Sequence, residues 1–99
     1  MRIFVKAEVF DTITSDAEVT RLRECVGKQI KKITDSGKLE LGWVTGDARS
    51  PMFILNVGSG AEVMDLLGSA FVDHFRIETH PILSLQELGK FFEQNPPGK

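Results

Sequence analysis

The amino-acid sequence predicts an α+β domain whose strands form one antiparallel sheet. Three segments place apolar residues at every second position, as half-buried strands do, and a fourth segment is apolar throughout. Three further segments repeat apolar residues every three or four positions, as amphipathic helices do. With 41% hydrophobic and 26% charged residues, the 99-residue chain suits one domain with a single core, expected to span residues 1–99.

The first two elements are a strand and a helix. Residues 2–10 alternate strictly, so one face of the predicted strand is apolar. Ser15 and Glu18 have the spacing of a capping box, which predicts the start of the helix, and Gly37 can end it in the left-handed conformation. The apolar strand face comprises Ile3, Val5, Ala7 and Val9. The buried side of the helix comprises Val19, Leu22, Cys25, Val26, Ile30 and Ile33.

Two strands joined by a polar turn follow. Residues 38–44 alternate, which places Leu39, Leu41 and Trp43 on the face directed at the helices. Residues 52–57 are apolar on both sides, which is typical of a central strand. The turn at residues 46–50 makes the pair a hairpin.

The last part of the chain predicts a helix, a strand and a second helix. The first helix opens at residues 58–62, and Gly68 weakens its middle. Residues 74–80 alternate as the last strand, which Pro81 ends because proline has no amide to donate. Ser84 and Glu87 form a capping box before a short helix, and residues 94–99 form a C-terminal tail. The apolar sides of the two helices comprise Val63, Leu66, Leu67 and Ala70, and Leu85, Leu88, Phe91 and Phe92.

This β-α-β-β-α-β order with an extra C-terminal helix is the ferredoxin-like plan. In that plan both helices cover one face of the sheet, and we expect the third strand to separate the first from the last. The uncovered face would carry Phe4, Lys6, Glu8, Phe10, Glu40, Val44, His74, Arg76, Glu78 and His80. Because this face exposes aromatic residues to water, we expect two copies to pair their faces and close a dimeric α+β barrel. The C-terminal helix would cap the barrel or clasp the other subunit.

Charge and composition exclude several classes of partner. Twelve Lys and Arg against 14 Asp and Glu give a net charge of −2, which argues against nucleic acid. No apolar run approaches the roughly 20 residues of a membrane helix, and charges interrupt the opening residues before a signal peptide could form. Cys25 is the only cysteine, which fits a reducing compartment. We therefore expect a cytoplasmic homodimer or higher homo-oligomer that binds a small molecule and has no nucleic-acid or membrane partners.

Ionisable side chains gather on the predicted uncovered face. Glu8 could act as a base, His80 could shuttle a proton, and Arg76 could hold a carboxylate or an enolate-like oxygen through a forked contact. These three are the candidate catalytic residues. Lys6, His74 and Glu78 lie beside them and are candidate ligand-binding residues, and His74 could shuttle the proton instead. The alternative is that the six residues form interstrand ion pairs or a polar dimer interface.

A metal site is not expected from this pattern. His74 and His80 lie six residues apart on one strand, or roughly 20 Å, so they cannot bind one ion within a subunit. Residues 58–60 offer free amides for a phosphate, but an ordinary turn from strand to helix explains them as well. We therefore expect no metal and no cofactor.

Several stretches of the chain resemble a known family. They are Phe4-Val5-Lys6, Gly42-Trp43-Val44-Thr45-Gly46, Phe53-Ile54-Leu55-Asn56-Val57, Ala61-Glu62-Val63-Met64-Asp65-Leu66-Leu67 and His80-Pro81-Ile82-Leu83. On these stretches and on its element order, the chain resembles the dimeric α+β barrel superfamily and, within it, is similar to the muconolactone isomerases. The resemblance implies an enzyme that moves a proton within an unsaturated lactone, with acid and base groups inside the barrel and no metal.

The chain departs from that family after the hairpin glycine. The family carries a histidine and tyrosines there, whereas this chain reads Asp47-Ala48-Arg49-Ser50-Pro51 and has no tyrosine. None of the family's catalytic residues therefore carries over. Asp47 and Arg49 occupy the region and are further candidate ligand-binding residues.

Three functional hypotheses follow. The first is a homodimer that binds an organic carboxylate or lactone-like metabolite in the barrel and isomerises it by proton transfer. The second is a barrel of the same shape without turnover, which serves as a ligand-binding or accessory protein. The third is a cofactor-independent monooxygenase or a haem-degrading enzyme, which are activities of other barrels that this chain resembles. Whether the protein is an enzyme stays open at this point.

Overall fold

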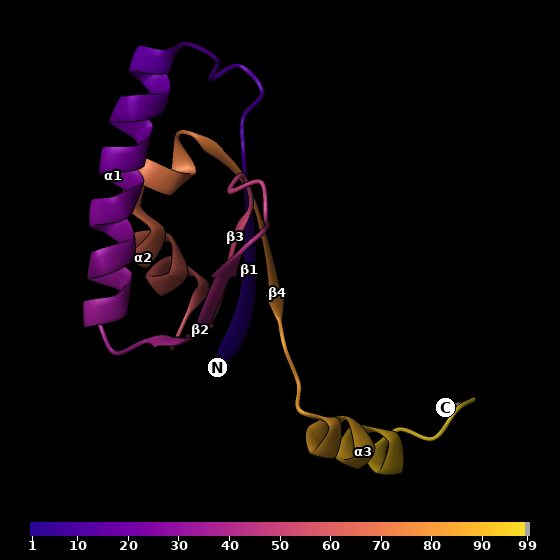
Figure 1. The fold of residues 1–99 in the computed structure, drawn as a ribbon. Coiled ribbons are helices and arrows are strands. Elements are labelled where there is room, and N and C mark those ends of the chain that lie inside the picture. The colour runs from indigo at the N-terminus through magenta and orange to yellow at the C-terminus, as the bar shows by residue number, and fades with distance from the viewer. Residues whose placement is uncertain (99) are drawn as a thin grey trace.

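The computed structural model describes residues 1–98 and consists of three helices and an open four-stranded antiparallel sheet (Figure 1). The elements are β1 (Arg2–Val9), α1 (Asp16–Asp35), β2 (Leu39–Val44), β3 (Pro51–Asn56), α2 (Gly60–Val72), β4 (Phe75–Pro81) and α3 (Leu85–Gln94). The expected α+β class and the order of the elements are confirmed. Gln94 belongs to α3 rather than to the expected tail, and Lys99, the last residue of that tail, lies outside the described residues.

The strands lie in the order β2-β3-β1-β4. The expectation that β3 separates β1 from β4 is wrong, because β1 itself lies between them. Both β3 and β4 run antiparallel to β1, one on each side, so the connection through α2 crosses β1. The ladder to β4 runs from Ile3 opposite Pro81 to Val9 opposite Phe75. Residues of β1 and β4 are therefore direct neighbours.

A β-bulge in β2 reverses the expected faces of its last residues. The pairing with β3 shifts between Leu39 and Leu41, so Glu40 is the extra residue of the bulge. Leu39 packs against the core, whereas Leu41 and Trp43 point to the opposite face and are 56% and 42% exposed. The prediction that Leu41 and Trp43 face the helices is wrong for this reason. Val44, expected on the uncovered face, turns toward α1 instead.

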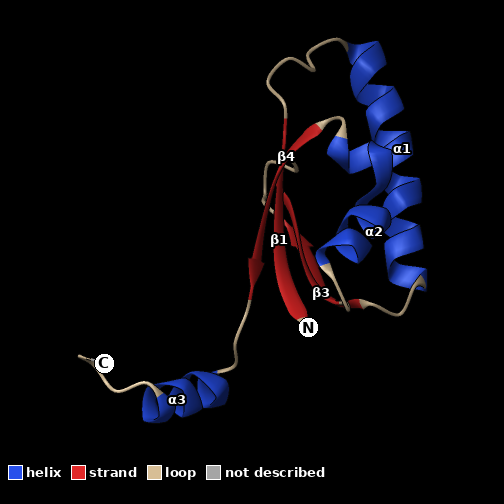
Figure 2. Ribbon diagram, turned by 180° about the vertical axis from the view of Figure 1, so that it is seen from behind, coloured by secondary structure: helices blue, strands red, loops and turns tan. Residues whose placement is uncertain are grey.

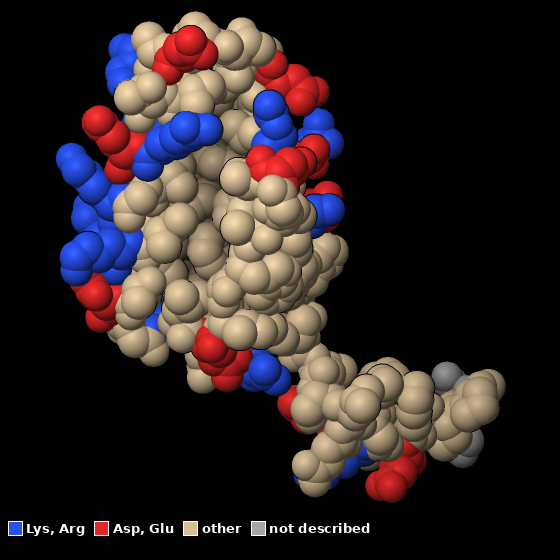
Figure 3. Space-filling view, in the orientation of Figure 1, with Lys and Arg blue, Asp and Glu red and all other residues tan. Residues whose placement is uncertain are grey.

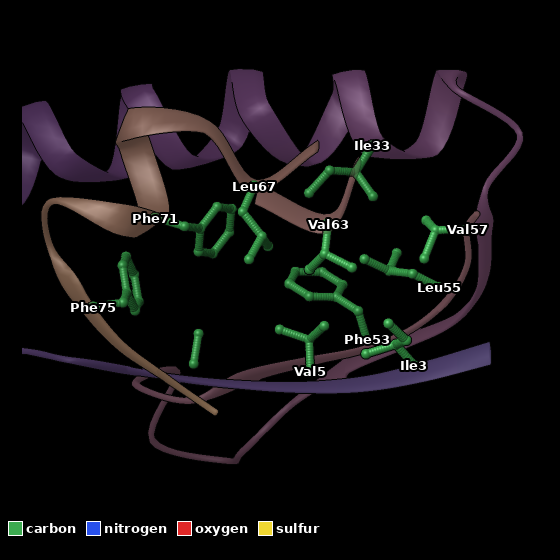
Figure 4. Close-up of a cluster of buried hydrophobic side chains, with 11 residues drawn as sticks. Ile3, Val5, Ile33, Phe53, Leu55, Val57, Val63, Leu67, Phe71 and Phe75 are labelled. Carbon is green, nitrogen blue, oxygen red and sulfur yellow. The ribbon is translucent and has the colours of Figure 1, made fainter. Parts of the chain in front are cut away.

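The core lies between the sheet and two helices. Figure 2 shows α1 and α2 on the same side of the strands. Phe71 is the largest fully buried side chain, and its ring meets the ring of Phe53 edge-on, with 5.7 Å between centroids, and lies 5.0 Å from that of Phe75 (Figure 4). Burying a large apolar side chain contributes about 1.5–3 kcal/mol. The core residues are Ile3, Val5, Ala7, Ile33, Phe53, Leu55, Val57, Val63, Leu67, Phe71 and Phe75.

Local signals set the ends of α1, although the predicted capping box at its start forms only in part. Ser15 Oγ accepts the Glu18 amide at 3.2 Å, but the Glu18 carboxylate accepts the Ser15 hydroxyl at 2.8 Å rather than the Ser15 amide. Gly37 follows the helix with φ +75°, the left-handed conformation. Only Ile33 of α1 is fully buried, because α1 packs closely on α2 rather than on the strands. Cys25 lies at the margin of the apolar stripe and is exposed, so the expectation that it is buried is wrong.

Gly68 interrupts α2. Its φ of +64° and ψ of −179° lie in a region that glycine adopts far more easily than any other residue. The side chain of Gln29 from α1 fills the space beside it, and its amide donates to the Leu66 carbonyl at 2.5 Å. A Cβ on residue 68 would lie 3.1 Å from that side chain. The glycine that the sequence marks only as a weak point thus allows α1 and α2 to approach each other.

The third helix stands apart from the rest of the molecule. Figures 1 and 2 both show α3 projecting from the end of β4, away from the sheet and from α1. Its start is set by a complete capping box, because the Ser84 hydroxyl accepts the Glu87 amide and the Glu87 carboxylate accepts the Ser84 amide. None of its residues is buried. No helix in residues 1–98 is both long enough and apolar enough to cross a membrane.

The interruption of α2 can be tested with a pair of glycine substitutions. Gly68→Ala should lower the free energy of unfolding by about 1–3 kcal/mol, because alanine is strained in this conformation and meets Gln29. Gly27→Ala is the control: an added Cβ there meets nothing within 4 Å, so it should stabilise α1 by up to about 1 kcal/mol. Urea denaturation followed by circular dichroism measures both. Equal effects of the two substitutions would contradict this role of Gly68.

Candidate functional site

The face of the sheet that no helix covers is called here the open face. Its residues occur in cross-strand rows set by the pairing registers. One row contains Leu41, Ile54, Phe4 and His80. The next contains Trp43, Met52, Lys6 and Glu78. The third pairs Glu8 with Arg76. The open face is therefore apolar toward β2 and β3, and charged toward β4.

The apolar half of the open face carries an aromatic cluster. The ring of Phe4 lies 6.1 Å from that of Trp43 and 6.3 Å from the imidazole of His80, between centroids. Trp43 in this cluster and Leu41 beside it are 42% and 56% exposed, although both side chains are apolar. Exposed apolar clusters of this kind are typical of surfaces that bind a partner or a ligand.

The charged half brings Glu8 and Arg76 together. They stand directly opposite each other at the end of the β1–β4 ladder, where Phe10 and Asp11 help to line a small hollow of about 40 Å³. Within residues 1–98, neither group has an oppositely charged side chain within 4 Å. Lys6 and Glu78 face each other one row away in the same manner. The Glu8 carboxylate and the Arg76 guanidinium are therefore both able to contact a ligand.

His80 does not join this pair within one subunit. It stands opposite Phe4, four residues along β1 from Glu8, or about 13 Å at the rise of a strand. Its Nε2 lies 3.9 Å from a carboxylate oxygen of Glu78. The structure therefore separates the three candidate catalytic residues into a Glu8–Arg76 pair and a distant histidine.

His74 lies on the opposite side of the molecule from the expected position. It belongs to the turn before β4, and its Nδ1 is 3.0 Å from the Ala70 carbonyl of α2. It lines a hollow of about 330 Å³ against α1, together with Leu22 and Cys25. The expectation that strand alternation carries His74 onto the open face is wrong, because β4 begins only at Phe75. Within residues 1–98, no three His, Cys, Asp or Glu side chains converge as metal ligands would.

Asp47 and Arg49 lie in the turn between β2 and β3. The Asp47 carboxylate accepts the Thr45 hydroxyl at 2.5 Å and the Arg49 amide at 3.0 Å, and these hydrogen bonds lower the pKa of Asp47. Between them, Ala48 has φ +61°, which is uncommon outside glycine. Both candidate ligand-binding residues line a hollow on the helix-facing side of the sheet, and the Arg49 carbonyl accepts the Val9 amide at 3.1 Å. Because neighbouring residues of a strand point to opposite faces, they lie across the sheet from Glu8 and Arg76.

A groove between α1 and the β2–β3 hairpin was not predicted from the sequence. Two adjoining hollows of about 490 and 380 Å³ form it and share Val26, Ala48 and Phe75 as lining residues. Figure 3 shows this hollow running between the helix and the sheet, lined by uncharged atoms, with charged side chains at its upper rim. We call it the α1 groove. Apolar spacing along α1 predicts which residues face inward but does not predict how far the helix stands from the sheet.

No protein-family model matches this chain, and no curated protein is similar enough to count as a relative. The interpretation of the site therefore depends on its geometry and chemistry.

Acid titration tests the role of Asp47 in the turn. Because the folded-state pKa lies below the ordinary value of 3.8, Asp47 should stabilise the fold above about pH 5 and lose that effect as the pH falls below 3.8 and through the lowered pKa. Asp47→Asn should lack this pH-dependent part, and Thr45→Val should lose some of it. Thermal unfolding between pH 2.5 and 7 measures the effect. Parallel curves of melting temperature against pH for wild type and Asp47→Asn would contradict it.

Proposed function

We propose that the chain forms a homodimer in which two open faces meet and close a dimeric α+β barrel of ferredoxin-like subunits. An antiparallel sheet with two helices on one face and strand order β2-β3-β1-β4 is compatible with that plan. The apolar half of the open face, with Leu41 and Trp43 largely exposed, supports pairing with a second copy. The cytoplasm is the proposed location, because the single cysteine suits a reducing compartment.

The proposed function of the barrel is to bind a small organic anion, such as a carboxylate or a lactone-like metabolite. The observation that carries it is the Arg76 guanidinium, which has no carboxylate within 4 Å among residues 1–98 and lies opposite Glu8 at the edge of an apolar surface. A guanidinium can hold a carboxylate through two parallel hydrogen bonds, while the apolar surface covers the hydrocarbon part of the ligand. Pairing of the two open faces would remove this site from bulk water and strengthen the ionic contact.

The same pair favours proton transfer as a second candidate function. Glu8 is a carboxylate base next to a cation that can stabilise an enolate-like oxygen, which is the chemistry of a muconolactone isomerase-like reaction. His80 is too far from Glu8 to serve the same substrate in one subunit, so only the His80 of a second copy could complete the set. Without turnover, the protein would be the ligand-binding or accessory barrel.

The dimer can be tested through Leu41. Leu41→Asp should yield monomers, because it places a charge in the apolar half of the open face, while the exposed position leaves folding little changed. Met64→Asp is the control, since Met64 is an exposed apolar residue of α2, on the side away from the open face. Light scattering coupled to gel filtration measures the mass. A Leu41→Asp variant that remains dimeric at micromolar concentration would contradict the proposed pairing.

Ligand binding can be tested through Arg76. A thermal-shift screen of small carboxylates, dicarboxylates and unsaturated lactones identifies a ligand through the rise in melting temperature. Arg76→Ala should weaken a carboxylate hit about ten- to hundredfold, because a charge-assisted contact contributes about 1.5–3 kcal/mol. Arg21→Ala, which removes a guanidinium from α1, should leave binding unchanged. Unchanged affinity in Arg76→Ala would remove Arg76 from the site.

Glu8→Gln separates turnover from binding in the same assay. In an isomerase it should abolish exchange of the substrate's acidic proton with deuterium while the ligand still binds. In a binding protein the wild type itself should show no exchange.

A further inference from the structure

α3 has an apolar side that no other part of residues 1–98 covers. Leu85, Phe91 and Phe92 are 87%, 51% and 61% exposed, and Leu83 before the helix is 59% exposed. The helix extends the molecule to 55 Å along its longest axis, and the radius of gyration is 16.3 Å against about 13 Å for a compact chain of this length. Such an arrangement is typical of a segment that packs on another molecule.

A helix of this length also needs packing to be stable. α3 has ten residues, and isolated helices shorter than about 12–15 residues are marginal in water. Its capping box fixes where the helix starts but does not replace a buried face. The spacing of Leu85, Leu88, Phe91 and Phe92 puts all four on one side, with Gln86 and Lys90 on the other. One side of the helix is therefore suited to an apolar groove.

The α1 groove has the matching character. Its apolar part is lined by Val26 and Ile30 of α1 and by Leu39, Val44 and Pro51 of the hairpin, and Ile30 and Val44 are 36% and 51% exposed. At the strand rise, the six residues of β2 span about 20 Å, enough for the roughly 15 Å of a ten-residue helix.

The α3 of the same chain cannot lie in this groove. The Ile82 amide is bonded to the Arg2 carbonyl, so only Leu83 and Ser84 connect the sheet to α3, and they allow at most about 11 Å. The groove lies at the β2 edge, which is three strand spacings or about 14 Å from β4. It is also on the helix-facing side of the sheet. The start of α3 can reach such a groove only on another molecule.

We infer that α3 packs into the α1 groove of a second copy, with Leu88, Phe91 and Phe92 against Ile30, Leu39 and Val44. The inference rests on the proposed homodimer and specifies its second contact. If a two-fold axis parallel to the strands relates the two copies and their open faces meet, β4 of one copy lies opposite the β2 edge of the other. α3 then continues from β4 into the neighbouring groove, and the exchange of two helices closes the dimer.

Site-directed disulfide formation tests this contact. Two variants without the native thiol, Cys25→Ser/Ile30→Cys and Cys25→Ser/Phe91→Cys, are coexpressed with different tags and oxidised with glutathione disulfide. The expected product is a covalent dimer that carries both tags, formed at least tenfold more than with the matched control Cys25→Ser/Lys90→Cys, whose thiol is on the polar side of α3. The mass of each uncrosslinked variant is measured by light scattering.

The outcomes separate this contact from the proposed dimer. Dimers that crosslink residue 30 to residue 91 but not to residue 90 support the exchange of α3. Dimers in which residues 91 and 90 crosslink equally, or neither does, overturn the exchange and leave the paired open faces intact. A wild-type protein that is monomeric at all concentrations overturns both. A variant with Phe91→Asp and Phe92→Asp should weaken the dimer at least tenfold, whereas Gln86→Asp should not.

Discussion

The pairing of β1 with two neighbours is the constraint on which the rest of the structure depends. β1 lies between β3 and β4, and its alternation buries Val5 and Ala7 under the helices. Because side chains in a strand alternate with period two, a shift of one residue would turn this whole set toward solvent. The buried side therefore fixes the register, and the register in turn fixes which residues stand together on the open face. Glu8 meets Arg76 because Ala7 must face the core.

The helix layer shows a second constraint, which concerns distance rather than register. Gly68 bends α2 so that Gln29 of α1 can reach the Leu66 carbonyl, and α1 is thereby held on α2. A helix held in this way does not close onto the β2–β3 hairpin, and the α1 groove remains between them. Besides the open face, the described residues leave two apolar features exposed, the lining of the α1 groove and the apolar side of α3. A second copy of the chain is proposed to cover all three.

Sequence patterns predicted where the helices and strands begin and end better than which face of the sheet some side chains occupy. The helix starts at Ser15 and Ser84, the left-handed Gly37 and the β2–β3 hairpin all agree with the structure, because caps and turns depend on a few neighbouring residues. The bulge at Glu40 has no such signal and reversed Leu41 and Trp43. His74 was misplaced for a related reason: one residue outside the strand no longer follows its alternation.

The sequence by itself determined the α+β class, the order of the elements and the apolar faces of β1 and α2, because all three depend on local spacing and on the segregation of apolar side chains from water. Only the tertiary structure decided the strand order, the meeting of Glu8 with Arg76, the separation of both from His80, the placement of Asp47 and Arg49 on the helix-facing side of the sheet, and the isolation of α3. These depend on pairings between residues far apart in the chain, and on how closely packed elements approach. No local pattern encodes either of them.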